Sequence, residues 1–477
     1  MSLIFCIYIF IFLNAVSCSR HFQRAIQYTL QNDCANFVND TLREEIQSYK
    51  NIVDDIMYEI TSNPLRDRFY NQYTEFIDKF GARPSGTDVL EQSIDYMVNL
   101  TIGAGIKDVT TEELEVPHWV RGFESVQMLE PRIKKIAVLG LGPSVSTPSE
   151  GITADLIVVS SFNDLDKLSE EDVKGKIVLF DEVYTNYGET VIYRVESASR
   201  AAKNGAVASL IRSVTPFSLY TPHTGYQHYE KDVPKIPTAA ITVEDAALLR
   251  RLYEKKEKIV LNIKMFSTYD RKKSRNTIID FKGSKYPDKY VIVSGHIDSW
   301  DVGQGAMDDG GGMMISWFVP VVLKHFQIRP KRTLRAILWT SEEAGLVGAQ
   351  AYLKRHLDEL DKINFIMESD EGTFKPLGLD VGGSKTAQCI IAEILKLFPT
   401  IDKMTESESP GSDIILFIKK GIPGASLLNE NDKYFWFHHT EADTMEVQKM
   451  EDVVKCAAFW TAISYVIADL SVDIPRQ

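Results

Sequence analysis

Cysteine is scarce in this sequence. Only five of the 477 residues are Cys, and two of them, Cys6 and Cys18, lie in or beside the apolar N-terminus. The remaining three are odd in number and widely scattered along the chain, namely Cys34, Cys389 and Cys456. This pattern predicts neither a disulfide framework nor a Cys-x-x-Cys metal site. We therefore expect the fold to depend on a large apolar core for its stability.

Positive charge is also in deficit. Lys and Arg number 53 against 66 Asp and Glu, which gives a formal net charge of −13. A protein that binds nucleic acid needs a basic face to neutralise phosphates, so nucleic acid is not expected as a partner. The apolar fraction of 44% and the charged fraction of 25% are ordinary for a globular protein and argue against wholesale disorder.

Long apolar runs are missing after the N-terminus, where a single run, SLIFCIYIFIFLNAV, occupies residues 2–16. This run is shorter than the roughly 20 residues that a membrane span needs, and small residues follow it. It predicts a signal peptide over residues 1–18 and no stable membrane span after cleavage. A short anchor is the alternative, because the positive n-region is missing. We expect a secreted protein, with a lysosome or another endomembrane lumen as further compartments. Asn39 and Asn99 begin Asn-x-Thr triplets and are candidate glycosylation acceptors on that route.

The order of apolar patterns divides the chain into two predicted domains. One is formed by residues 19–122 and 266–477, and residues 123–265 are inserted into it. From Tyr290 onward apolar strands alternate with helices, which predicts an α/β fold with a mostly parallel central sheet covered by helices on both faces. The insert has short β-like runs, two helical stretches and no cluster of metal ligands. We expect it to be a discrete α/β module that is not continuous with the central sheet, rejoins it at two nearby ends and roofs the site.

Candidate metal ligands gather where the predicted strands end, which is where α/β sheets bind their ligands. They are His296, Asp298, Asp308 and Asp309 after YVIVSG, Glu342 and Glu343 after TLRAILWT, Asp370 and Glu371 after NFIMES, and His438 and His439 beyond GASLLN. Two His and at least four carboxylates that converge on one edge predict a metal site and not a set of solvated loops. Spacing alone distinguishes neither Glu342 from Glu343 nor His438 from His439.

The ligand types indicate the metal and its chemistry. Imidazole with carboxylate suits Zn²⁺ or a neighbouring first-row metal. Two His with three or more carboxylates exceed what one tetrahedral ion needs, but they match two ions about 3.5–4 Å apart that share a bridging carboxylate. A further carboxylate, not bound to metal, is needed to take the proton of an attacking water. Asp298 lies two residues from His296, on the same face of an extended strand, and is expected to fix the tautomer of that imidazole.

Five longer motifs carry a resemblance to a known family: SGHIDSWDVGQGAMDDGGG, WTSEEAGLVGA, MESDEGTF, GIPGASLL and FHHTEADTM. They are similar to those of the di-zinc exopeptidases of the aminopeptidase and glutamate carboxypeptidase group. The likeness covers nearly the whole chain, and the middle block corresponds to that family's protease-associated insert. The resemblance implies two zinc ions per chain, a small peptide substrate (especially a dipeptide with unblocked ends) and a homodimer. It also implies that His296 and Asp370 bind one zinc, that Glu343 and His439 bind the other, that Asp308 bridges them, that Glu342 is the general base, and that Asp298 orients His296.

Two alternatives share this fold: a non-catalytic receptor or binding module that has lost ligands, and a single-zinc cyclase. The retention of the bridge, the base and the four other ligands favours a hydrolase. The five other His have no carboxylate at a useful sequence spacing and are expected to be surface or core residues, namely His118, His223, His228, His325 and His356. Because each His ligand must be neutral to bind metal, we expect acid to release zinc and activity to be highest near neutrality.

Overall fold

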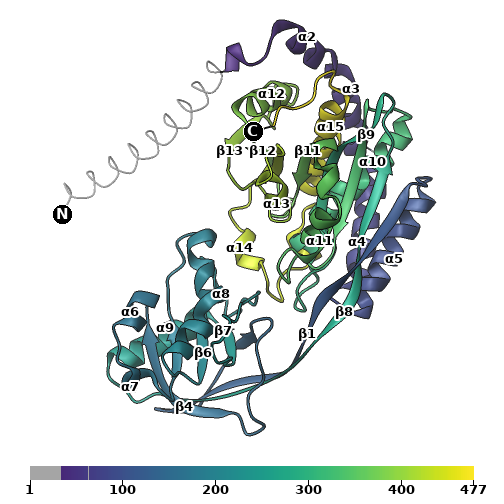
Figure 1. Cartoon of the computed structure of the whole chain (residues 1–477). Coiled ribbons are helices and arrows are strands. Elements are labelled where there is room, and N and C mark those ends of the chain that lie inside the picture. The colour runs from purple at the N-terminus through teal and green to yellow at the C-terminus, as the bar shows by residue number, and fades with distance from the viewer. Residues whose placement is uncertain (1–33, 63, 477) are drawn as a thin grey trace, which may run out of the picture.

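The computed structural model describes residues 34–62 and 64–476. The predicted signal peptide lies outside the described residues. Within the described part of the chain, no helix combines the length and the apolar character that crossing a membrane requires. The chain forms two lobes: a larger one that holds the helices after Cys34 and the C-terminal helix, and a smaller one built from the middle of the chain (Figure 1).

The larger lobe is built on a mixed sheet. Its strand order is β13 (Lys403–Glu406), β12 (Pro376–Gly382), β14 (Gly424–Asn429), β11 (Ile363–Glu368), β9 (Tyr286–His296), β10 (Arg332–Trp339) and β8 (Val260–Phe281). The pairs from β14 through β11 and β9 to β10 are parallel. The β12–β14 and β10–β8 pairs are antiparallel. The α/β fold with a central parallel sheet is therefore confirmed, with antiparallel strands on both sides of the parallel centre.

Helices cover both faces of this sheet, because alternate strand residues are apolar on each side. Along β9, Val291 and Val293 enter the larger core, whereas Ile292 enters the opposite one. The larger core also takes residues from α2 (Asp40–Ser48), α3 (Lys50–Thr61), α4 (Leu65–Phe80), α5 (Asp88–Gly103), α10 (Gly311–Phe326), α12 (Lys385–Leu395) and α15 (Met450–Asp469). The smaller core of this lobe lies under α11 (Val347–Arg355) and α13 (Ile415–Ile418).

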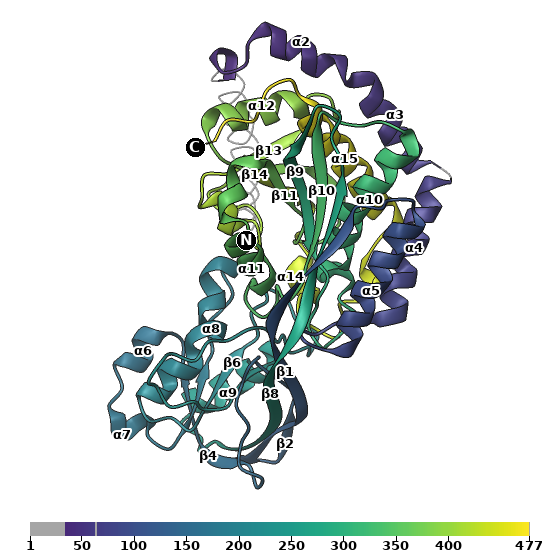
Figure 2. The same ribbon diagram turned by 45° about the vertical axis from the view of Figure 1, so that its right-hand side comes forward.

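A long antiparallel ribbon carries the chain to the insert and back (Figure 2). It consists of β1 (Val109–Glu130) and β8, with a bulge between Arg121 and Glu124. The insert contains β2 (Lys134–Ile136), β3 (Val138–Gly140), β4 (Ile152–Val159), β5 (Ile177–Phe180), β6 (Ala208–Arg212) and β7 (Thr238–Ile241), together with α6 (Phe162–Asp166), α7 (Glu170–Val173), α8 (Tyr187–Lys203) and α9 (Val243–Glu254). Two apolar clusters lie wholly within this part of the chain.

The insert shares a strand with the central sheet, which the sequence analysis did not predict. Strand β8 hydrogen-bonds to β10 in the larger lobe and, further along its length, to β4 in the insert. The expectation that the insert would not be continuous with the central sheet is therefore wrong. The physical reason is the length of β8, since a strand of 22 residues spans roughly 70 Å at about 3.3 Å per residue and can serve both lobes.

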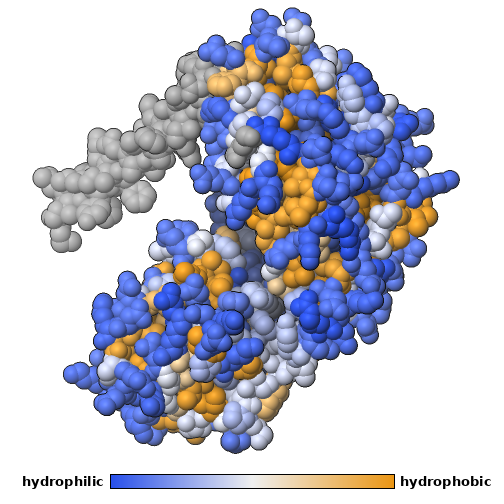
Figure 3. Space-filling model, viewed as in Figure 1, coloured by the Kyte–Doolittle hydropathy of each residue, from blue (hydrophilic) through white to orange (hydrophobic). Residues whose placement is uncertain are grey.

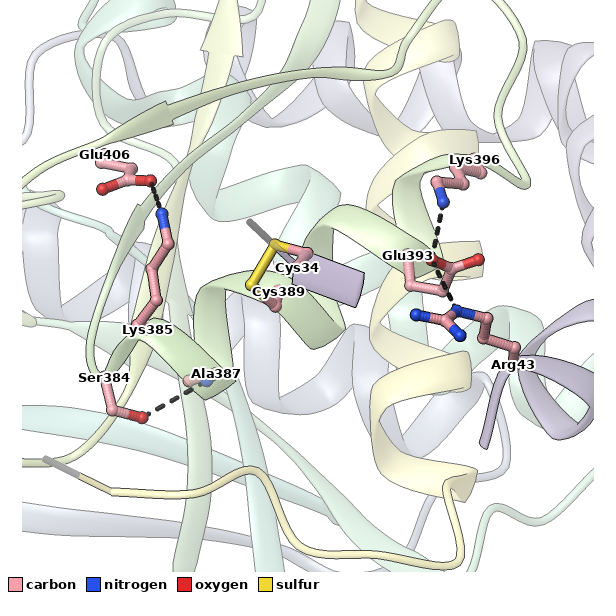
Figure 4. Close-up of a disulfide and its surroundings, with 9 residues drawn as sticks. All are labelled: Cys34, Arg43, Ser384, Lys385, Ala387, Cys389, Glu393, Lys396 and Glu406. Atoms are coloured by element: carbon pink, nitrogen blue, oxygen red, sulfur yellow. Dashed lines mark hydrogen bonds and ion pairs between the residues drawn. A yellow bond between two sulfur atoms is a disulfide. The ribbon is translucent and has the colours of Figure 1, made fainter. Parts of the chain in front are cut away.

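A disulfide joins Cys34 to Cys389, which are 355 residues apart. It ties the short helix η1 (Cys34–Asn36) to α12, where Arg43 Nε also lies 3.8 Å from Glu393 Oε2 (Figure 4). The prediction that the cysteines form no disulfide framework is thus corrected, because a pair this far apart leaves no spacing pattern in the sequence. Cys456 is free and buried.

Candidate metal centre

The metal loop, which we define as residues 295–312, is held between β9 and α10 by the buried side chain of Asp309. Its Oδ2 accepts a hydrogen bond from the N–H of His296 (3.0 Å), and its Oδ1 accepts one from the N–H of Gly312 (3.0 Å). A Cβ at position 312 would lie 1.9 Å from the carbonyl oxygen of Ser369, so this close approach requires glycine. The glycine-rich sequence therefore lets the metal loop pack against the end of β11.

The first half-site is formed by His296, Asp370 and one oxygen of Asp308. His296 Nε2 lies 3.0 Å from Asp370 Oδ1 and 3.3 Å from Asp308 Oδ1. The other ring nitrogen, Nδ1, faces the backbone carbonyl oxygen of Asp298 at 3.0 Å, which leaves Nε2 available for a metal. Asp370 Oδ2 accepts a hydrogen bond from the Ser412 hydroxyl (2.5 Å), which leaves Oδ1 for the same metal.

The second half-site is formed by Glu343, His439 and the other oxygen of Asp308. Glu343 follows β10, and His439 follows the short helix α14 (Tyr434–Phe437). His439 Nε2 lies 3.1 Å from Glu343 Oε2 and 3.3 Å from Asp308 Oδ2. Asp308 thus directs one carboxylate oxygen to each half-site, as a bridging ligand would.

The donor set fits zinc. Asp308 Oδ2 and Glu343 Oε1 are buried and lack a hydrogen-bond partner within the described chain. Buried carboxylate oxygens without partners are costly, and a divalent cation between the ligands would satisfy both. Imidazole nitrogen with carboxylate oxygen is a ligand combination typical of zinc. Ligand atoms lie within 4.8 Å of one another in three groups, namely His296–Asp308–Glu343, Asp308–His438–His439 and His296–Asp309–Asp370.

Distances distinguish the neighbouring residues that spacing could not. Glu343 Oε2 is 3.1 Å from His439 Nε2, whereas Glu342 Oε2 is 4.0 Å from His296 Nε2. His439 Nε2 lies close to two carboxylates, but His438 Nε2 lies 3.6 Å from the bridging carboxylate. This geometry favours Glu343 and His439 as ligands, and it leaves the Glu342 carboxylate beside the centre.

Asp298 supports both half-sites, but not in the way that its spacing predicts. Its Oδ1 lies 3.7 Å from His296 Nδ1, farther than its own carbonyl oxygen at 3.0 Å. The carboxylate instead accepts hydrogen bonds from the N–H groups of Glu342 (3.0 Å) and Glu343 (3.2 Å). One fully buried acid therefore positions the first His through its backbone and the Glu pair through its side chain.

Two buried residues that the sequence analysis did not identify hold the metal loop from the larger lobe. Asp443 accepts hydrogen bonds from the N–H groups of Met307 (2.7 Å) and Asp308 (3.1 Å). Arg83 is fully buried and donates to three backbone carbonyl oxygens of the metal loop, those of Ile297 (2.6 Å), Gln304 (2.8 Å) and Gly305 (2.8 Å). Arg83 stands in GARPSGT, which has the pattern of an ordinary turn, so no sequence signal marked its role.

Crowded charges shift the pKa values of the site. Burial would lower the pKa of His439, but the charges of Glu343 and Asp308 outweigh burial and raise it to about 9. Burial and the nearby charge of Asp370 raise the pKa of Glu342 well above its usual range. Without a metal, the site therefore favours the neutral form of Glu342 and the protonated form of His439, and a divalent cation must displace the proton on His439 to bind.

A cavity of about 320 Å³ opens on the two half-sites between the lobes, and Figure 3 shows the surface hollowed there. The larger lobe contributes Glu342 and four of the five candidate ligands, and the insert contributes Tyr187, Arg194 and Tyr226. Arg194 lies on α8 and donates from Nη2 to the Tyr187 hydroxyl (2.8 Å). Its Nε is buried and lacks a hydrogen-bond partner within the described chain.

The remaining histidines separate into two kinds. His118 pairs with Asp270 (2.6 Å), and His356 pairs with Glu112 (2.7 Å). Asp270 and Glu112 are distant in sequence, but His356 Nδ1 also lies 2.9 Å from Glu359 Oε2, only three residues further on, so the expectation that His356 has no carboxylate at a useful spacing is wrong. His223 is buried in the insert, and its Nδ1 faces the carbonyl oxygen of His438 at 2.7 Å. His223 is a core residue, as expected, but it lies in the part of the insert that contacts the segment carrying His438 and His439.

The chain matches known proteins along both lobes. Residues 276–464 match peptidase family M28, and residues 142–249 match the PA domain. Carboxypeptidase Q of Xenopus laevis is 49% identical to the chain over 439 residues, which cover 92% of this chain and 93% of that protein. Carboxypeptidase Q of Homo sapiens is 47% identical over 440 residues, which cover 92% of this chain and 93% of that protein.

Solved structures share the fold of this chain. The crystal structure of a peptidase M28 precursor from Shewanella amazonensis matches with a TM-score of 0.86 and 28% identity, and the match covers 91% of this chain and 99% of that chain. A zinc aminopeptidase from Bacillus subtilis matches with a TM-score of 0.64 and 22% identity, covering 86% and 98%, and shows the fold alone. The chain belongs to peptidase family M28, and it is a zinc metallopeptidase of the carboxypeptidase Q kind.

Proposed function

We propose that this chain is a secreted two-zinc exopeptidase that hydrolyses small peptides, especially dipeptides, with a free C-terminal carboxylate. The observation that carries the number of metals is the position of Asp308, whose two carboxylate oxygens lie 3.3 Å from His296 Nε2 and 3.3 Å from His439 Nε2. A single ion would leave one of these two half-sites without a cation. In our proposal His296, Asp370, Glu343 and His439 are the outer ligands, and Asp308 is the bridge.

In this proposal Glu342 is the general base. When bound, zinc supplies Lewis acidity, which polarises the scissile carbonyl and makes an attacking water more acidic. The Glu342 carboxylate lines the cavity beside the ligands and has the raised pKa that suits proton transfer near neutral pH. It takes the proton from the water and returns it to the leaving amine. Asp298 holds Glu342 in place through the hydrogen bond to its N–H (3.0 Å).

Arg194 is the group that we propose binds the substrate's terminal carboxylate. It is the one Arg or Lys among the described residues that line the cavity. Its Nη1 lies 3.4 Å from His439 Nδ1, but two protonated nitrogens cannot bond to each other. Because Nη1 is therefore free to donate, the guanidinium can hold one oxygen of a carboxylate through a charge-assisted hydrogen bond. A cavity of about 320 Å³ is at the small end of ligand pockets and favours short peptides.

A dipeptide library with free, N-acetylated and C-amidated members tests the proposal, with and without a chelator. We expect free dipeptides to be cleaved, the chelator to abolish cleavage, and C-amides to react roughly 10–100-fold more slowly because Arg194 loses its anionic partner. Arg194→Met should raise KM for free dipeptides and remove the preference over amides. Arg200→Met is the matched control, since Arg200 lies on the same helix but pairs with Glu196 (3.0 Å) at the surface. Equal rates for acids and amides in the unmodified enzyme would exclude carboxylate recognition.

The compartment and the assembly state are part of the same proposal. A disulfide fits an oxidising compartment, and both sequon residues, Asn39 and Asn99, are exposed. We propose secretion with cleavage after residue 18, and a homodimer in solution. Mass spectrometry of the mature protein tests the cleavage point and the glycans, and light scattering tests the dimer. A monomer at micromolar concentration would reject the dimer without affecting the catalytic proposal.

A further inference from the structure

The two metal-binding histidines differ in what holds their rings. His296 Nδ1 faces the carbonyl oxygen of Asp298 in its own lobe (3.0 Å). His439 Nδ1 faces the carbonyl oxygen of Thr224, 215 residues away in the insert, at 3.2 Å. A His that binds metal through Nε2 carries its proton on Nδ1 and needs an acceptor there, which fixes the orientation of the ring. The acceptor for His439 therefore belongs to the other lobe.

Two more hydrogen bonds join the insert to the same segment. The N–H of Thr224 donates to the carbonyl oxygen of His439 (3.1 Å). The Nδ1 of His223 faces the carbonyl oxygen of His438 at 2.7 Å, so it carries the proton and donates. His439 has a φ of +60°, in the left-handed region that non-glycine residues rarely adopt. The insert thus forms hydrogen bonds with both the ring and the backbone of His439, and these bonds stabilise a left-handed backbone conformation that is unfavourable by itself.

Arg121 fixes the insert segment against the metal loop. Its guanidinium donates to both carboxylate oxygens of Asp301 in the metal loop (2.7 and 2.9 Å). It also donates to the Thr224 hydroxyl (3.1 Å) and to the carbonyl oxygen of Gly140 (2.7 Å). The Thr224 hydroxyl in turn donates to the same Gly140 carbonyl (2.7 Å). A paired guanidinium therefore connects the metal loop to the residue that orients His439.

We propose that the insert completes the second half-site: the Thr224 carbonyl fixes the His439 ring, and Arg121 is the positioning residue that holds Thr224 against the metal loop. This inference rests on the proposed two-zinc function. It makes the insert part of the metal centre in addition to a wall of the cavity. The first half-site has no ligand whose ring or carboxylate is held by the insert in the described contacts, so the two zinc affinities should be separable.

Calorimetric titration of zinc into the metal-stripped full-length protein tests this inference. We expect the unmodified protein to bind two zinc ions. Arg121→Met and His223→Phe should each weaken one zinc roughly 10–100-fold, the usual effect of removing a group that supports a metal ligand, and leave the other unchanged. Arg250→Met is the matched control: it removes an Arg–Asp181 pair (2.6 Å) inside the insert, away from the interface, and should change neither affinity.

A second background identifies which zinc is affected. In Glu343→Gln, which should lose the second zinc, adding Arg121→Met should leave the affinity of the remaining zinc unchanged. Thermal unfolding of the metal-free variants shows whether the fold is intact. Unchanged affinities in Arg121→Met and His223→Phe, or equal weakening of both zinc ions, would overturn the inference. An unmodified protein that binds fewer than two zinc ions would instead reject the proposed function on which it rests.

Discussion

The two proposed half-sites offer the same kinds of ligand but are built on different supports. His296 is the last residue of β9, Asp370 follows the neighbouring parallel strand β11, and the groups that hold them come from the same lobe. His439 follows a four-residue helix and takes its ring acceptor from the insert. The difference teaches that the ligands of one half-site can be positioned by the central sheet alone, whereas the orientation of a ligand in the other half-site depends on the contact between the two lobes.

Glu342→Gln should have the largest effect on activity, and it tests the general base that we propose serves both half-sites. Because Glu342 is assigned to proton transfer and not to metal binding, zinc content should stay unchanged while kcat falls roughly 10²–10⁴-fold. Metal analysis alongside initial rates measures both quantities. Glu343→Gln is the matched neighbour and should lose zinc. If Glu342→Gln emptied a half-site while Glu343→Gln kept both, the assignments of the pair would be reversed.

Arg83→Met tests the comparison between the half-sites, because it disturbs the metal loop that carries Asp308, the ligand proposed to be shared by both. Arg83 is fully buried and satisfies three carbonyl groups of the metal loop. Its loss leaves these acceptors unpaired and should lower the free energy of unfolding by about 2–4 kcal/mol. Both zinc affinities should fall together, unlike the single affinity expected to change in Arg121→Met. Denaturant unfolding and zinc titration give the two readouts, and weakening of only one zinc would refute the distinction.

Zinc binding should release protons, with a pH dependence that reports on His439. Glu343 and Asp308 outweigh burial and raise its pKa to about 9, so in the metal-free protein it is protonated at neutral pH. In that form its contribution to stability is fully present below its unfolded pKa of about 6.5 and is lost as pH rises toward 9. Zinc affinity changes in the opposite sense, rising about tenfold per pH unit for each proton released. Calorimetry in buffers of different ionisation enthalpy measures the release, and a buffer-independent enthalpy would contradict it.

Breaking the disulfide should have the smallest effect on the metal centre. Replacing Cys34 and Cys389 by Ser removes a cross-link over 355 residues and should lower the free energy of unfolding by about 2–4 kcal/mol. Neither zinc affinity should change, because the bond ties η1 to α12 and touches no residue of the half-sites. Denaturant unfolding with zinc titration again separates stability from metal binding. A selective loss of one zinc would show that the larger lobe transmits strain to the centre.

The part of the site that follows the strands was predictable, and the part supplied by the insert was not. His296, Glu343 and Asp370 each lie at or just after the end of an apolar strand, and the carboxyl ends of parallel strands lie at one edge of a sheet. Thr224 acts through its backbone carbonyl, which every residue possesses, so its type carries no signal. The fold was predictable for the same reason as the first half-site, since local patterns encode strands and helices. The continuity of β8 through both lobes and the pairing of Cys34 depend on contacts between distant segments, which local patterns do not encode.

The Cys34–Cys389 bond also constrains the order of events during synthesis. Its partners are 355 residues apart, and at about 5–20 residues per second the ribosome needs roughly 20–70 s to make the intervening chain. During that interval the Cys34 thiol has no native partner, while the ribbon and the insert are already emerging. The bond therefore can form only after most of the chain has been made. Until Cys389 is made, the nascent chain must keep Cys34 from pairing with other thiols.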